Sequence, residues 1–302
     1  MSKLYIILCL LAVSLISDGP DCAAKSNDND VIVCCRLEKS EFYINETVRA
    51  TFWLYSDADD IEYIEQVSPS VLDKGKFDYV TETPDMPRIH KEKIKNKEYT
   101  AVPISSHVIS IGHPGSYKLS SGRYRIGLLY RVYRDDPYRG RFITLEPRSV
   151  EIDMRPLSFK VKPLPKVPED MAFSGAVGVF DVETVIPRGN IIVNEEATAL
   201  IYVRGSGKLG SEVLPEYHEA FGHGNKLKSF SENTNAFYEN GKYMSELELQ
   251  CQFVPTDINN CEIGVVKFAY FNPETQKYEI AQSEPIKIDV KSSAVKLKPV
   301  YI

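Results

Sequence analysis

Residues 122–134, GRYRIGLLYRVYR, constrain the fold most strongly because their side chains alternate in character. One predicted face contains Tyr124, Ile126, Leu128, Tyr130 and Val132, and the other contains Arg123, Arg125 and Arg131. A period of two is typical of a β-strand with one buried and one solvated face. This segment is therefore predicted to be a strand at the surface of a hydrophobic core.

Similar short runs recur along the whole chain. Val, Ile, Thr, Tyr and Phe crowd into segments such as 31–38, 47–56, 99–111 and 244–254, which Pro, Gly, Asn and Asp separate. This composition favours strands over helices. With roughly seven strands in each half, the sequence predicts an all-β chain of tandem immunoglobulin-like β-sandwich domains.

An internal echo supports two related domains. Residues 44–55 read INETVRATFWLY and residues 193–204 read VNEEATALIYVR. Each has an aliphatic residue, then Asn-Glu, then a long strand, which predicts the same turn between the first strands of each sandwich.

The N-terminus resembles an export signal. Lys3 precedes an apolar run from Leu4 to Ile16, which is short for a membrane span, and Ala23-Ala24 offers a small-residue cleavage region. The predicted organisation is a signal peptide (1–24), a first sandwich (28–163), a Pro-rich linker (164–172), a second sandwich (173–291) and a C-terminal tail (292–302). The expected location is the periplasm, with membrane association through partners rather than through a transmembrane helix in this chain.

Export permits disulfides. Cys251 and Cys261 lie on successive predicted strands, so either a disulfide between them or two buried free thiols is compatible with the sequence. Cys34 and Cys35 are adjacent in one strand and are predicted to point to opposite faces without pairing with each other. Cys22 leaves lipidation open, although Gly-Pro-Asp before it does not suit that cleavage.

Two segments resemble chemical motifs only superficially. GSGKLG (205–210) matches a dinucleotide fingerprint, but Pro215 follows where a helix is required. His218 and His223 in HEAFGH are five residues apart, a spacing that does not bring both onto one metal ion. We predict no catalytic residue, no metal site and no cofactor.

The segment 123–142 interleaves arginines with aromatic residues, as single-stranded nucleic-acid sites do. Asp135 and Asp136 interrupt it, and the formal net charge of the chain is -6. We therefore expect no nucleic-acid binding, and interpret the arginines as a solvated strand face or as a surface for an acidic protein partner.

Residues 159–209 carry a resemblance to a known family. Val161-Lys162-Pro163-Leu164-Pro165 is followed by Phe173-Ser174-Gly175-Ala176-Val177-Gly178, by Asn194-Glu195, and by the loop Gly205-Ser206-Gly207-Lys208-Leu209. In this order they resemble the BatD family of oxygen-tolerance (aerotolerance) proteins of Bacteroides-type and other bacteria. The family loop usually has Asn where this chain has Lys208.

The resemblance implies an exported, non-catalytic interaction or scaffold protein of the bacterial envelope that acts with membrane proteins containing von Willebrand A domains. It supplies no catalytic residues. The alternative is a carbohydrate- or cell-wall-binding module, which would present exposed aromatic residues; the candidates are Tyr138, Tyr217, Phe221 and Tyr238.

FSGAVGVF (173–180) is interpreted as the entry strand of the second sandwich, after a PLP segment that stiffens the join. We expect Ser174, Gly175 and Ala176 to be small because another backbone passes close by, Gly178 to mark a bulge, and Phe173 to wedge between the domains.

Overall fold

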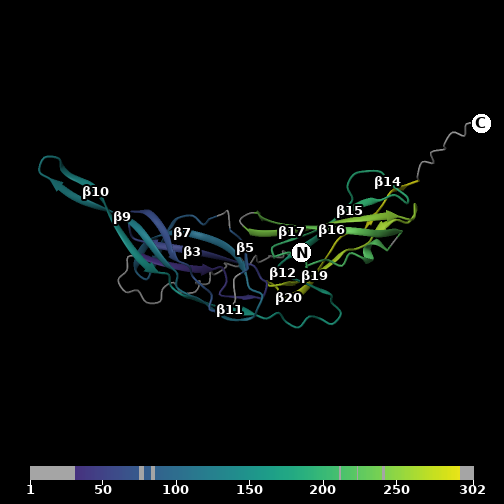
Figure 1. The fold of residues 1–302 in the computed structure, drawn as a ribbon, viewed down its shortest axis with the longest axis horizontal. Helices are drawn as coiled ribbons and strands as arrows, with labels where there is room; N and C mark the ends of the chain where they lie inside the picture. Colours follow the sequence, from purple (N-terminus) through teal and green to yellow (C-terminus); the bar gives the residue numbers. More distant parts are fainter. Residues whose placement is uncertain are drawn as a thin grey trace, which may run out of the picture.

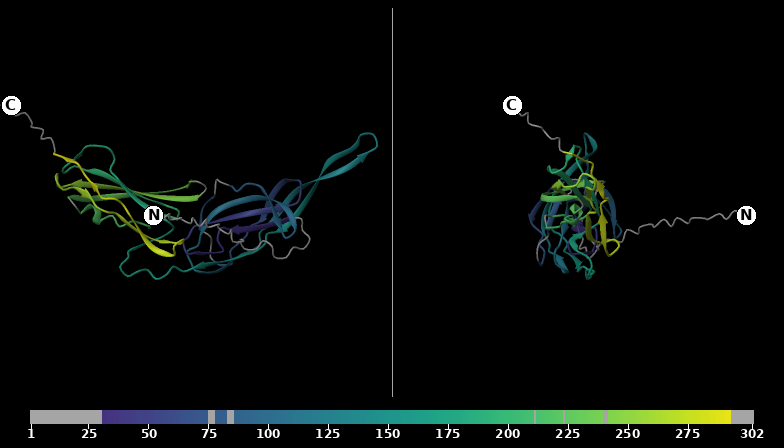
Figure 2. Two further views of the ribbon diagram at one scale, coloured as in Figure 1. Left: turned by 180° about the vertical axis from the view of Figure 1, so that it is seen from behind. Right: turned by 90° about the vertical axis from the view of Figure 1, so that its right-hand side faces the viewer.

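The computed structural model describes residues 31–74, 78–82, 86–210, 212–222, 224–239 and 242–292. Within these ranges the chain is almost entirely β, with one 3₁₀ turn, η1 (Glu219–Phe221), and no α-helix. The predicted all-β class is confirmed. Figures 1 and 2 show an elongated molecule, with β1–β11 forming one half and β12–β22 the other.

The first half encloses one hydrophobic core between its sheets. Strand order is β1-β3-β7-β5, with β6 also on β7, in one sheet, and β10-β9-β4 and β2-β11-β8 in two others. Side chains from all three sheets meet in this core, which draws on residues 31–161. The strands are β1 (Val31–Leu37), β2 (Glu41–Tyr43), β3 (Val48–Ser56), β4 (Asp60–Ser68), β5 (Asp78–Glu82), β6 (His90–Ile94), β7 (Lys97–Ser110), β8 (Gly115–Leu119), β9 (Arg123–Asp136), β10 (Gly140–Asp153) and β11 (Leu157–Lys162).

The second half has a separate core, built on the sheet β13-β15-β17-β16 and the sheet β12-β19-β20, with the pairs β14-β22 and β18-β21. Alternation is strict in its central strands, because Ile201 and Val203 of β15 and Leu247 and Leu249 of β17 are fully buried. The strands are β12 (Phe173–Val177), β13 (Phe180–Val185), β14 (Ile191–Ile192), β15 (Ala197–Gly205), β16 (Asn225–Glu239), β17 (Lys242–Pro255), β18 (Glu262–Ile263), β19 (Lys267–Asn272), β20 (Lys277–Gln282), β21 (Ile286–Lys287) and β22 (Val290–Lys291).

The sequence echo corresponds to a repeated turn. Asn45 and Asn194 both have a left-handed backbone, with φ of 60° and 64°, which asparagine tolerates better than most residues. In each turn the N–H of the following glutamate donates to a carbonyl three residues earlier, at 3.1 Å. The preceding short strand pairs in parallel with the last strands of its own half, β2 with β11 and β14 with β22. Both halves therefore contain the same short parallel strand followed by the same Asn-Glu turn.

The predicted signal peptide, Cys22 and all but the first residue of the predicted tail lie outside the described residues. Residues 163–172 contain no strand and connect β11 to β12. The two cores fall on either side of this segment, while the immunoglobulin-like detail and the domain bounds stay predictions.

Candidate functional site

Three residues of the segment 159–209, Leu164, Phe173 and Val177, lie where the two halves meet. Tyr43, Val177 and Phe271 form a small buried cluster, against which Leu164, Phe173 and Tyr278 pack. We call these six side chains the joint. Tyr43 comes from the first half, Leu164 from the connecting segment and the others from the second half, so the joint fastens all three parts of the chain together.

Ring contacts and hydrogen bonds hold the joint. The ring centroids of Tyr43 and Phe271 are 4.8 Å apart, those of Phe271 and Tyr278 5.2 Å, and those of Phe173 and Tyr278 5.0 Å. The Tyr278 hydroxyl donates to the Pro165 carbonyl at 2.7 Å. Phe173 thus lies at the join, as expected, and Pro165 is tied to the second half through its carbonyl.

Two further hydrogen bonds cross between the halves. The Tyr43 hydroxyl donates to Gln276 Oε1 at 3.2 Å, and Thr47 Oγ1 donates to the Ser206 carbonyl at 3.0 Å. Asn194 and Glu195 do not belong to the joint, because they are exposed at their own turn, where the Asn194 N–H donates to the Pro255 carbonyl. The segment 159–209 therefore supplies residues both to the joint and to a turn of the second half.

The two glycine-containing segments, FSGAVG (173–178) and GSGKLG (205–210), pack against each other. A Cβ atom on Gly178 would lie 2.7 Å from Gly207 N and 2.8 Å from its Cα, and one on Gly207 would collide with the Val177 carbonyl oxygen. The Ser206 N–H donates to the Val179 carbonyl at 3.0 Å. GSGKLG therefore packs against FSGAVG, and its glycines permit backbone contact.

The expected roles of Gly175 and Gly178 are reversed. A Cβ atom on Gly175 would meet nothing within 4 Å, and the residue is needed for its φ of +91°. The irregular register of β12 lies between Phe173 and Val177. The irregular part of β12 thus contains Gly175, and the close backbone approach is at Gly178. Ser174 is used for its hydroxyl, which donates to the Ala269 carbonyl at 2.6 Å.

A cleft of about 550 Å³ opens beside the joint and takes its lining from both halves. Two of its cationic side chains form ion pairs: Lys39 Nζ lies 2.5 Å from Glu46 Oε1, and Arg36 lies 2.6 Å from Glu92 outside the cleft. The lining includes Arg36, Lys39, Glu46, Thr47, Arg49, Trp53, Val177, Gly178, Ser206, Lys242, Tyr243 and Glu274.

Of the two alternatives for Cys251 and Cys261, the structure has two buried free thiols and no disulfide. Cys251 points into the second core, and the Cys261 thiol donates instead to Asn225 Oδ1 at 2.7 Å. Burial raises the pKa of Cys251 to about 12, so this thiol is protonated and weakly nucleophilic at neutral pH. Cys35 is free and points into the first core, whereas Cys34 is disulfide-bonded and lies on the opposite face.

Of the two histidines considered for metal binding, His218 lies within the described residues. Among the residues that the structure describes, no group of three or more His, Cys, Asp or Glu side chains could hold a metal ion. His218 precedes η1 and stacks on Tyr217, with ring centroids 4.3 Å apart, whereas His223 lies outside the described residues.

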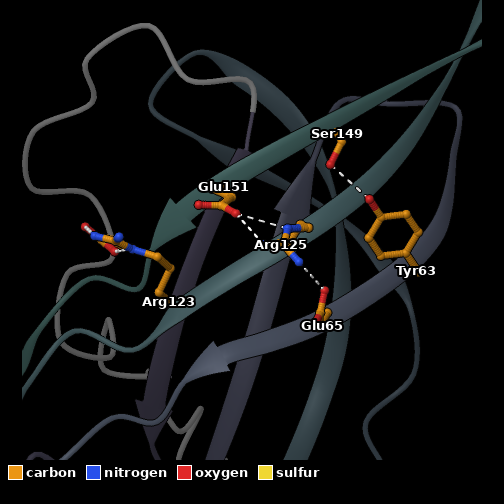
Figure 3. Close-up of polar contacts among 7 residues, drawn as sticks. Tyr63, Glu65, Arg123, Arg125, Ser149 and Glu151 are labelled. Carbon is orange, nitrogen blue, oxygen red and sulfur yellow. Dashed lines mark hydrogen bonds and ion pairs between the residues drawn. The ribbon is translucent and has the colours of Figure 1, made fainter.

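The arginines at the base of β9 belong to a solvated strand face (Figure 3). Arg125 bridges Glu65 at 2.8 Å and Glu151 at 2.7 Å, and Arg123 pairs with Asp153 at 2.7 Å. Beside them the Tyr63 ring covers Gly127 and its hydroxyl is 2.9 Å from Ser149 Oγ. These guanidinium groups are already matched by carboxylates, which agrees with the first of the two interpretations of this segment.

The outer part of the β9–β10 hairpin projects beyond the first half (Figure 1). Strand β4 pairs with β9 only up to Leu129, whereas β10 continues beside β9 to Asp136. We call residues 130–146 the arm. Its exposed apolar side chains are Tyr133, Tyr138, Phe142, Ile143 and Leu145.

Sequence reasoning missed the arm. The alternation assigned Tyr130 and Val132 to a buried face, yet both are only half-buried because no sheet covers the arm. Strands β9 and β10 have 14 residues each, well above the usual strand length of about five or six. This unusual length was the sequence signal that could have indicated a projecting hairpin.

The aromatic residues considered for carbohydrate binding do not form one exposed group. Tyr217 and Phe221 are each only 2% exposed, which corrects their assignment as surface residues. Tyr238 is half-buried, and only Tyr138, at the arm tip, is 98% exposed.

The Glu279 carboxylate stabilises the turn between β19 and β20, which contains Gln276, the hydrogen-bond partner of Tyr43. Glu279 accepts hydrogen bonds from Asn272 Nδ2 at 3.0 Å, Thr275 Oγ1 at 2.6 Å and the Tyr270 hydroxyl at 3.1 Å. The hydrogen bond from Asn272, and then that from Thr275, lowers the pKa of Glu279 below its ordinary value.

We therefore expect an acid-sensitive joint. A lowered folded-state pKa contributes stability above the ordinary value of 4.5, and this contribution is lost as pH falls through the folded-state pKa. As pH falls over this acidic range, the free energy of unfolding measured in urea should decrease more steeply for the wild type than for Glu279→Gln. Parallel pH profiles of the two proteins would contradict the assignment.

Comparisons with known proteins identify no family. No protein-family profile matches the chain, and no curated protein matches it. Among solved structures, the adhesin InvE of Yersinia pseudotuberculosis has a TM-score of 0.21 and 11% identity, covering 84% of this chain and 58% of the adhesin. A conserved domain protein from Bacillus anthracis has a TM-score of 0.18 and 10% identity, covering 92% and 94% of the two chains.

The chain thus spans 58% of the adhesin's length. At these TM-scores the likenesses assign neither a fold family nor a function. Among the residues that the structure describes, no helix has the length and apolar character needed to cross a bilayer.

Proposed function

We propose that the chain is an exported, non-catalytic scaffold of the bacterial envelope, similar to BatD proteins linked to oxygen or stress tolerance, that binds membrane proteins with von Willebrand A domains. The observation that supports this most is the arm, which carries exposed Tyr133, Ile143 and Leu145 away from the body. Exposed apolar groups gathered on one projecting element are typical of protein-binding surfaces.

The joint supports the same proposal. Connections through the Tyr43–Phe271 contact and the Thr47–Ser206 hydrogen bond oppose free swivelling of one half on the other. A scaffold benefits from this arrangement because ordering before binding lowers the entropic cost of association. The carbohydrate alternative retains only Tyr138 of its four candidate residues in a fully exposed position, so we do not propose it.

The test is cross-linking in cells of the source organism, followed by affinity capture from solubilised membranes. Wild type should recover membrane proteins with von Willebrand A domains, and the triple variant Tyr133→Ser, Ile143→Thr, Leu145→Thr should lose them. A matched control changes Ile89→Thr and Ile258→Thr, which are exposed and lie outside residues 130–146. Equal recovery by the arm variant, or no such protein with wild type, would overturn the proposal.

A further inference from the structure

Strand β16 is the longest edge strand of the second half among the described residues. It lies at the end of the sheet β13-β15-β17-β16 and, among the described residues, pairs only with β17. All nine residues from Lys228 to Ala236 are exposed. Such an edge presents unpaired N–H and C=O groups to any strand that can lie beside it.

Proline and lysine, which commonly protect a long edge, are missing from most of β16. After a register shift between Leu227 and Ser229, residues 229–239 run against β17 without irregularity. This segment, SFSENTNAFYE, contains no proline, lysine or arginine. The other long edge strand, β10, has Pro147 near its middle, which interrupts pairing by a further strand.

The regular segment is also compatible with a copy of itself. Antiparallel pairing centred on its midpoint, Thr234, would set Phe230 opposite the Tyr238 of a second chain, twice by symmetry. It would set Asn233 opposite Asn235 and would place no two like charges opposite each other. Aromatic cross-strand pairs stabilise such a ladder, whereas opposed like charges weaken it.

We propose that β16 is a dimerisation edge, at which two copies of the chain join antiparallel about Thr234 to form one continuous sheet. A closed two-fold pairing uses the same edge on both copies and leaves neither available for further addition. The dimer would present two arms. This inference does not depend on the proposed function, because it concerns a different surface and a different partner.

The test measures the mass of the purified protein by sedimentation across a wide concentration range. Wild type should dimerise, and Thr234→Lys should raise the dissociation constant at least about tenfold, because it opposes two ammonium groups on the axis. Thr234 is exposed and its partner on β17 is Leu247, so the substitution creates no charge clash within one chain. The matched control, Thr144→Lys on the edge strand β10, should dimerise as wild type does.

A charge-swap experiment makes the test specific. Thr234→Glu should also impair self-association, and an equimolar mixture of Thr234→Glu with Thr234→Lys should recover dimer. A wild type that is monomeric at all concentrations would overturn the proposal. So would a dimer that persists in Thr234→Lys, one that is lost in Thr144→Lys, or a mixture that stays monomeric.

Discussion

Replacing Phe271 by alanine is expected to lower the free energy of unfolding by about 3–5 kcal/mol, the range for a fully buried aromatic side chain. Phe271 is 0% exposed and contacts Tyr43 of the first half and Tyr278 of its own half. The cavity left by the substitution would weaken the second half and would also remove the principal ring contact between the halves.

The second consequence separates this variant from an ordinary core substitution. Urea unfolding, followed by circular dichroism and by Trp53 fluorescence, should change from coincident to separate transitions, because Trp53 is the only tryptophan and lies in the first half. Small-angle scattering should show a broader distribution of particle lengths. Tyr138→Ala, at a 98% exposed position, is the control and should change neither result. Coincident transitions in Phe271→Ala would show that the joint does not couple the halves.

Replacing Gly207 by alanine is expected to lower the free energy of unfolding by about 1–3 kcal/mol through overpacking. The added Cβ would collide with the Val177 carbonyl oxygen and would approach the Phe180 ring. Backbone atoms cannot move aside as the end of a flexible side chain can, so the contact between the two glycine-containing segments must open.

The same loop supplies the control. A Cβ on Gly210 would meet nothing within 4 Å, so Gly210→Ala should be neutral or slightly stabilising, since alanine restricts the unfolded chain. The measurement is the free energy of unfolding of both variants in urea, compared with that of the wild type. Equal stabilities for Gly207→Ala and Gly210→Ala would mean that close packing is not the reason for glycine at 207.

Local pattern was enough to predict many of the strands and the repeated turn, but it did not predict β4 or β16. Alternation placed Leu247, Leu249, Cys251 and Phe253 on one face, and all four are fully buried. The Asn-Glu echo predicted two equivalent turns, and Asn45 and Asn194 share a left-handed backbone there. These features depend on residues close in sequence, whose side-chain directions follow from strand geometry itself.

Longer-range contacts could not be read in the same way. Whether Cys251 reaches Cys261 depends on where two strands lie in the sandwich, and the structure places Asn225 beside Cys261 instead. Likewise, Tyr217 and Phe221 follow no strand pattern, and only the packing of η1 against the second core buries them.

The sequence by itself determined that this chain is all-β and where many of its strands and both Asn-Glu turns fall, because periodicity and turn chemistry act over a few residues. Only the tertiary structure decided that Gly178 meets Gly207, that Tyr43 meets Phe271 across the join, and that the arm extends beyond β4. The physical reason is that such contacts join residues far apart in sequence, and their partners are set by how whole sheets pack.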